Sequence, residues 1–147
     1  AFDSYLLLRS LKTLVVRMER HNTSAMEIAK FLEKRKDIKK VIYPGLKTHP
    51  QHKLAARQMN GFGGIVSFEI KGKLPKAKSF LRKTKIFTLA ESLGGVESLI
   101  EHPGLMTHAS LSKDRREKLG ISDTLIRLSI GLENIEDLKE DINQALK

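Results

Sequence analysis

The sequence predicts an α+β domain in which helices pack on a small sheet, and three observations support this fold class. Residues 1–36 carry apolar side chains at helical spacing, so the chain is expected to open with a long helix. The rest alternates short β-type runs with short helical patterns, which is the order expected for helices layered on a sheet. With 147 residues, 40% of them hydrophobic, the chain is long enough to build one core.

The first element is expected to be a helix from Ser4 to Lys36, with Asp3 or Ser4 as its N-cap. Its apolar residues form one stripe, which consists of Leu7, Leu11, Leu14, Met18, Ala25, Ile28, Ala29 and Leu32. Asn22-Thr23-Ser24 interrupts this stripe, so we expect a break or kink there. Such a long helix in a small domain is typical of an element that connects two domains or packs at an interface.

Short strands and helices are expected to alternate through the middle of the chain. The β-type runs predict strands at Val41–Tyr43, Ile65–Ile70, Ile86–Leu89 and Val96–Ile100. Helical patterns predict helices over His49–Met59, where Pro50 is tolerated in the first turn, and over Pro75–Arg82.

The last third of the chain carries clear capping signals. Ser112 is expected to cap a helix that runs to Leu119 and is closed by Gly120. An alternating strand follows at Leu125–Ile130, and Asn134 is expected to cap the final helix. The buried face of that helix is predicted to consist of Ile135, Leu138, Ile142, Ala145 and Leu146.

The chain carries a net charge of +10 and concentrates its basic residues in two segments, Lys34–Lys40 and Lys71–Lys85. Few aromatic side chains are available for base stacking, and no groove-reading motif is present, so we interpret both segments as solvated surface rather than a nucleic-acid interface. No apolar run is long enough to span a membrane, and no signal peptide is expected from the acidic start. The absence of cysteine excludes disulfides and thiolate catalysis in this chain, and we expect a cytoplasmic location.

Arg127 lies in the middle of the strand predicted near the end of the chain. Strand alternation places it on the face opposite Ile126 and Leu128. An arginine in an apolar strand is unfavourable unless it is paired, and its planar guanidinium suits bidentate binding of a carboxylate. From the residues alone, two interpretations remain: a carboxylate-binding residue, or a structural ion pair with Glu91 or Asp123.

The segment Phe87–Leu99 combines the end of a strand with an acidic residue, a hydroxyl and two glycines. Glu91 and Ser92 follow the strand directly, and Gly94-Gly95 lets a backbone approach a ligand closely. Loops at strand ends are where binding sites are usually built. A simple glycine turn with a polar rim is the alternative interpretation.

Three further groups of residues are candidates for an acid or base, a metal site or a phosphate site. Thr107 and His108 lie together in a predicted loop, where His108 is more often a packing or surface residue than an acid or base. His49 and His52 straddle Pro50 and have no nearby carboxylate, so no metal site is expected there. The glycines of the segment 61–64 precede a strand rather than a helix, so no phosphate cradle is expected.

Several stretches form a further pattern, in this order: Asp3–Leu14, Tyr43–Leu46 with His49–His52, Phe62–Gly64, Phe87–Ser98, Met106–Ser110, and Gly120–Asp123 followed by Leu125–Gly131. Together they resemble the C-terminal half of the Cys/Met metabolism family of pyridoxal-phosphate (PLP)-dependent enzymes. The resemblance covers essentially the whole chain. It is highly specific for the family and only modestly specific for one member.

The resemblance implies the C-terminal domain of a fold-type-I PLP-dependent transferase, with helices on a small, mostly antiparallel sheet. Residues 1–36 would be the long interdomain helix and residues 37–147 the C-terminal small domain, with the PLP-binding N-terminal domain outside this chain. The first residue is not Met, which agrees with a piece of a longer protein. The family also implies a homotetramer.

Site residues follow from the resemblance position by position. Arg127 matches the family arginine that binds the substrate α-carboxylate, and Ser92 and Thr107 match residues that help to hold this group. Glu91 matches a position tied to the preference for γ- over β-chemistry. The functional interpretation of Arg127 and Ser92 is therefore favoured over the structural one.

No segment resembles the family motif around the lysine that bonds covalently to PLP, and Lys12 is a poor candidate for this role. We therefore expect no catalytic, cofactor-binding or metal-binding residue in this chain. PLP would be held by the N-terminal domain, and the chain alone would be inactive.

For the whole protein the resemblance implies γ-elimination of L-cystathionine to L-cysteine, 2-oxobutanoate and ammonia, a step of transsulfuration. The segments Met106–Ser110 and Gly120–Arg127 favour this activity over two alternatives in the family, synthesis of cystathionine and γ-cleavage of methionine. An alternative of another class is a non-catalytic domain that binds amino-acid carboxylates or nucleic acid.

Overall fold

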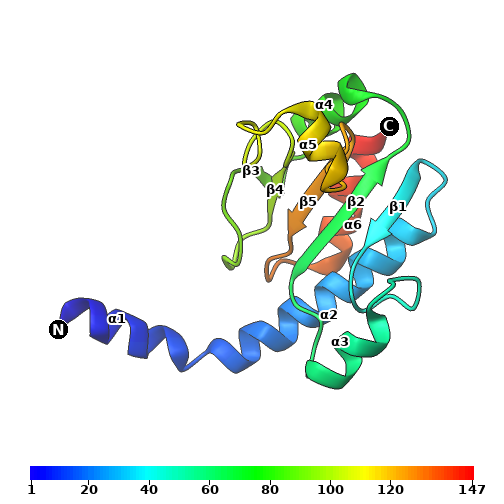
Figure 1. Ribbon diagram of the computed structural model, residues 1–147. Helices are drawn as coiled ribbons and strands as arrows, with labels where there is room; N and C mark the ends of the chain where they lie inside the picture. The colour runs from blue at the N-terminus through cyan, green and yellow to red at the C-terminus, as the bar shows by residue number, and fades with distance from the viewer.

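The computed structural model describes residues 1–147 and contains six helices and one five-stranded sheet (Figure 1). The helices are α1 (Phe2–Leu11), α2 (Leu14–Glu33), α3 (His52–Gln58), α4 (Leu74–Lys83), α5 (Lys113–Lys118) and α6 (Ile135–Leu146). The strands are β1 (Ile38–Ile42), β2 (Ile65–Ile70), β3 (Thr88–Leu89), β4 (Leu99–Glu101) and β5 (Leu125–Ser129). Their order in the sheet is β1-β2-β5-β4-β3, and only the β3–β4 pair is parallel. The predicted α+β fold with a mostly antiparallel sheet is confirmed.

The two faces of the sheet have different chemistry because side chains alternate along each strand. On one face Ile126 and Leu128 of β5 join a core of 21 buried residues, to which α2, α4 and α6 contribute. On the other face β5 presents Arg127, which pairs in register with Ser67 of β2 and with Glu101 of β4. The apolar face holds the domain together, and the opposite face carries the polar residues.

The long N-terminal helix breaks at a different place from the predicted one. The chain leaves helical geometry between α1 and α2 at Thr13, which has a φ of −110° and a ψ of 4°, whereas α2 is continuous through residues 22–24. The polar residues that interrupt the apolar stripe have other partners: Asn22 accepts a hydrogen bond from the Gly63 amide (2.7 Å), and Thr23 donates to a carbonyl of its own helix. The prediction of a break at Asn22-Thr23-Ser24 was therefore wrong.

Helix α1 projects away from the rest of the molecule at the N-terminal end (Figure 1). None of its residues is buried. Its exposed apolar residues are Phe2, Tyr5, Leu6, Leu7, Leu8 and Leu11. Isolated exposed apolar residues are ordinary, but a contiguous set on one helix marks an interaction surface.

The remaining elements follow their sequence signals closely. Strand β2 has the predicted bounds, and the predicted caps of α5 and α6 are present: Ser112 accepts from the Arg115 amide (3.4 Å) and Asn134 from the Glu136 amide (2.9 Å). Strands β3 and β4 are shorter than predicted, so the chain between them forms a loop. No helix of the structure is long and apolar enough to cross a membrane.

Candidate functional site

The polar face of the sheet is organised around Arg127 and Glu101. Their positions are directly opposite in the antiparallel β4–β5 ladder, and the Nε atom of Arg127 lies 3.0 Å from Oε1 of Glu101. The Arg127 side chain is 20% exposed, whereas that of Glu101 is 1% exposed. Neither terminal Nη nitrogen of Arg127 donates a hydrogen bond within the chain, so both have donors available for an incoming anion.

Thr107 joins this pair from the loop that follows β4. Its hydroxyl donates to Oε1 of Glu101 over 3.2 Å and also lies 3.0 Å from Nδ1 of His108. The loop is fixed by His102, which is buried and whose Nε2 lies 3.0 Å from the carbonyl of Asp123, while its Nδ1 accepts from the Leu105 amide (3.2 Å). One buried carboxylate therefore contacts a guanidinium from β5 and a hydroxyl from a separate loop.

The loop that carries Glu91 and Ser92 is tied to the same strand as Arg127. The Gly94 amide donates to the hydroxyl of Ser129 over 2.8 Å, and Gly94 has a φ of 79°, a conformation that favours glycine. Ser129 lies two residues after Arg127 and therefore on the same face of β5. The predicted glycine turn is thus an anchored loop at the edge of the polar face.

A second set of hydrogen bonds fixes the far end of this loop. Buried Ser98 donates its hydroxyl hydrogen to Glu133 (2.8 Å) and accepts from the Gly131 amide (2.8 Å). The Ser98 amide also donates to Glu133 over 2.6 Å. The chain before β4 is thereby held against the chain after β5.

The structure brings together some predicted site residues but not all. Arg127 and Thr107 meet through Glu101, whereas no ion pair or hydrogen bond joins Glu91 or Ser92 to Arg127, and both lie exposed on their loop. The prediction that Arg127 would form an ion pair with Glu91 or Asp123 was wrong. The Oδ2 atom of Asp123 instead lies 3.8 Å from Nζ of Lys113. The partner is Glu101, which sequence reasoning missed because the predicted strand ended one residue before it.

The two histidines near Pro50, His49 and His52, form hydrogen bonds with the backbone. The ring nitrogen Nδ1 of His52 lies 2.8 Å from the carbonyl of Pro44, and Nδ1 of His49 accepts from the Gln51 amide (3.2 Å). Both histidines therefore shape the turn before α3.

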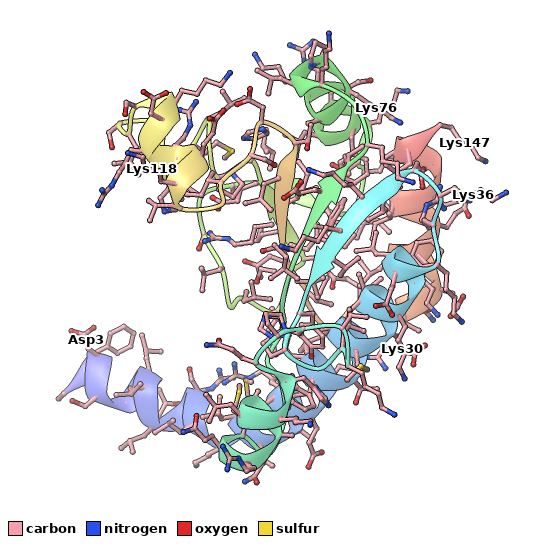
Figure 2. All side chains as sticks on the ribbon, turned by 45° about the vertical axis from the view of Figure 1, so that its right-hand side comes forward. Asp3, Lys30, Lys36, Lys76, Lys118 and Lys147 are labelled. Carbon is pink, nitrogen blue, oxygen red and sulfur yellow. The ribbon has the colours of Figure 1, made fainter.

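The two basic segments lie at the surface, at the opposite end of the molecule from α1. Figure 2 shows Lys36, Lys76 and Lys147 there, whereas Asp3 lies on the projecting α1. Within the first segment, Arg35 forms a bidentate pair with Asp37, and its hydrogen bond holds the pKa of the Asp37 carboxyl below its usual value.

The lysines of this chain do not fit a PLP site. A lysine that bonds to PLP must react as a neutral amine in a sheltered position. Every lysine except Lys139 is exposed, and the hydrogen bond from Lys139 to Glu136 raises the pKa of the Lys139 amine, which favours its charged form. No lysine pairs with Glu101 on the polar face. No lysine of this chain therefore has the sheltered, neutral character that a bond to PLP requires.

The chain is similar to known enzymes over nearly its whole length. The chain is 60% identical to cystathionine γ-lyase of Dictyostelium discoideum over 145 residues, which are 99% of this chain and 38% of that protein. It is 61% identical to cystathionine γ-lyase of Bos taurus, with 99% and 36% coverage, and 57% identical to cystathionine β-lyase of Coxiella burnetii, with 99% and 38% coverage. The chain thus spans little more than a third of the length of these curated relatives.

A solved structure has the same fold. Cystathionine γ-synthase from Xanthomonas oryzae pv. oryzae, crystallised in complex with cystathionine, superposes with a TM-score of 0.93 at 50% identity, covering 99% of this chain and 38% of that one. The model of the family described as Cys/Met metabolism PLP-dependent enzymes matches residues 1–147. Since this match covers the whole chain, the chain belongs to the Cys/Met metabolism family of PLP-dependent enzymes.

Proposed function

We propose that this chain is the part of a cystathionine γ-lyase that binds the substrate carboxylate. The observation that carries the proposal is Arg127, whose guanidinium is mostly buried on the polar face while its two Nη groups lack an acceptor. An arginine in this state suits the planar, bidentate recognition of a carboxylate. The 60% identity to a cystathionine γ-lyase over nearly the whole chain supports the choice of family member.

Each predicted site residue then has a defined task. Arg127 clamps the α-carboxylate of the amino acid and so fixes the orientation of the reacting carbons. Thr107 contacts Glu101, the partner of Arg127, and Ser92 lies on the loop anchored at Ser129, which supports a role for both residues beside the carboxylate. Glu91 is exposed next to Ser92, which supports a contact with the distal part of the substrate and so an influence on γ- against β-chemistry.

We propose that PLP is held by an N-terminal part of the protein that lies outside this chain. Two observations support this: the lysines here do not fit a PLP site, and the matched relatives are more than twice as long. When bound, PLP supplies the electron sink for breaking the carbon–sulfur bond. The chain itself orients the substrate and is expected to be inactive alone.

The exposed apolar face of α1 supports the same assembly. We propose that residues 1–36 form the interdomain element and residues 37–147 the small domain, with α1 packed against the N-terminal part or a neighbouring subunit of a homotetramer. In this arrangement the leucines of α1 are buried. A cytoplasmic location belongs to the same proposal, and cell fractionation would test it.

The complete protein containing this chain provides the test. Arg127→Ala is expected to lower kcat/KM for L-cystathionine by roughly 100-fold or more, because a misplaced substrate loses about that much rate. PLP absorbance should stay unchanged, since Arg127 does not hold the cofactor. Arg57→Ala is the matched control, because Arg57 is exposed on α3. Full activity of Arg127→Ala would refute the proposal.

The products identify the family member. Release of 2-oxobutanoate from L-cystathionine indicates a γ-lyase, whereas release of pyruvate indicates a β-lyase. Formation of cystathionine from cysteine and an activated homoserine ester indicates a γ-synthase, and cleavage of methionine indicates a methionine γ-lyase. We expect 2-oxobutanoate to be the main product from L-cystathionine.

A further inference from the structure

We propose that Glu101 is a positioning residue of the carboxylate site, a role that rests on the proposed function of Arg127. Glu101 does not reach the substrate in this proposal. It holds Arg127 through Nε, so that the Nη donors of Arg127 face one carboxylate, and it accepts the hydroxyl hydrogen of Thr107, which fixes the loop beside them.

The first argument is the register of the sheet. Glu101 and Arg127 are directly opposite in the antiparallel β4–β5 pair, so their side chains leave the same face only a few ångströms apart. Ser67 occupies the corresponding position of β2 on the other side of Arg127 and is uncharged. Glu101 is therefore the charged neighbour that the ladder gives to Arg127.

The second argument is which nitrogen Glu101 contacts. The 3.0 Å contact is made to Nε, the guanidinium nitrogen closest to the backbone along the side chain, and neither terminal nitrogen donates a hydrogen bond to Glu101. If Glu101 paired with the two Nη nitrogens instead, it would occupy the positions at which a substrate carboxylate could bind. Contact through Nε fixes the plane of the guanidinium while leaving the Nη groups for a second carboxylate, because the five N–H donors of arginine point in different directions.

The third argument is that stability does not explain Glu101. Its Oε2 atom is buried without a hydrogen-bond partner, and its side chain is only 1% exposed. Asp141 is a buried carboxylate with a structural role in the same fold. Both of its oxygens accept hydrogen bonds from backbone amides. A buried charge that is only partly satisfied destabilises a fold, and such residues are typical of functional sites.

Ligand titration of the complete, PLP-loaded protein tests this role, with PLP absorbance as the signal. The two probes are L-2-aminobutanoate and propylamine, which differ only in the carboxylate. Glu101→Gln keeps the size of the side chain and is expected to weaken binding of L-2-aminobutanoate about tenfold, the range typical of groups that orient a binding residue. Binding of propylamine should not change, because it does not use Arg127.

Glu69→Gln is the matched control. Glu69 lies on the same face of the sheet, is also buried, and pairs with a lysine, Lys39, over 2.8 Å, but it is opposite Leu125 rather than Arg127. This variant should bind both probes as the unmodified protein does. Glu101→Ala is expected to have a larger effect than Glu101→Gln, roughly 100-fold, and if it does not fold, the Gln variant decides.

The outcomes separate this inference from the proposed function. If Glu101→Gln binds L-2-aminobutanoate normally, or loses both probes equally, Glu101 does not position the carboxylate site. Arg127→Lys is measured in parallel and should lose affinity for L-2-aminobutanoate only. If Arg127→Lys retains this affinity, the proposed function of Arg127 fails as well.

Discussion

Asp141, in the middle of α6, offers a direct test of how this helix holds the chain that leads into the candidate site. Its carboxylate is 4% exposed and accepts hydrogen bonds from three consecutive backbone amides, those of Lys85 (2.8 Å), Ile86 (2.8 Å) and Phe87 (3.1 Å). These residues immediately precede β3. Asp141→Ala removes both acceptor oxygens, and with them all three hydrogen bonds, and leaves the amides without partners.

The structure allows the size of this effect to be estimated. A hydrogen bond to a charged group contributes about 1.5–3 kcal/mol, and contributions of three bonds to one carboxylate do not add fully. We take about 2–3 kcal/mol as the loss for local opening of this segment. Since about 1.4 kcal/mol corresponds to a factor of ten, the amides of residues 85–87 should exchange with solvent roughly 30–150 times faster.

Hydrogen–deuterium exchange of the peptide spanning residues 84–90, measured by mass spectrometry on the complete protein, provides the assay. Asp137→Ala is the control, because Asp137 is exposed in the first turn of the same helix and contributes only about 0.3–1 kcal/mol through the helix dipole. Exchange in Asp141→Ala that stays within about threefold of Asp137→Ala would show that the carboxylate does not hold this segment.

Three further predictions concern other parts of the molecule. Burial raises the pKa of the Tyr43 hydroxyl to about 12, above its usual 10, so its contribution to stability is complete below pH 10 and is lost as the pH rises through 12. Tyr43→Phe loses the 2.9 Å hydrogen bond to the Gly63 carbonyl and should lower the free energy of unfolding in urea by about 1 kcal/mol at neutral pH. The same variant should lose less stability than the unmodified protein when the pH is raised through 12. Gly131→Ala would place a Cβ against the carbonyl of Val96, so this variant should displace the loop before β4 and lower cystathionine turnover, whereas an unchanged kcat/KM would contradict the close packing. Leu8→Glu on the exposed surface of α1 should reduce the oligomer mass of the complete protein in light scattering if α1 contacts a neighbouring subunit, and an unchanged mass would exclude this surface from the subunit contacts.

Much of the fold could be predicted because its signals are local. The β-type run of β2 and the caps at Ser112 and Asn134 involve residues within a few positions of each other, and all three predictions are confirmed. The break between α1 and α2 could not be predicted, because the residues there include no glycine or proline. It is stabilised by a longer-range contact, in which Arg17 donates to the carbonyl of Ser10 over 2.8 Å.

The candidate site was only partly accessible to sequence reasoning. Arg127 was found because an arginine in an apolar strand is conspicuous in any sequence. Glu101 was missed because acidic residues at strand ends are common, and its importance comes from the β4–β5 register, which pairs positions 26 residues apart. The residues 98, 129 and 133, which fix the loop of Glu91 and Ser92, were missed for the same reason: their partners lie 33 to 35 positions away.

The polar face of the sheet explains why a carboxylate site can be built on a strand that also forms the core. Along β5 the odd positions 125, 127 and 129 share one face, while Ile126 and Leu128 lie in the core on the other. Rigid packing of the apolar side therefore fixes the backbone from which Arg127 projects, and a site on a rigid strand is more precise than one on a loop. The hydroxyls that come from loops need separate anchors, and Glu101 and Ser129 supply them from the same face. Substitutions on the two faces of the sheet should therefore have different effects. Substitutions in the core should unfold the domain, whereas substitution of Glu101 should leave a folded domain that binds carboxylates weakly.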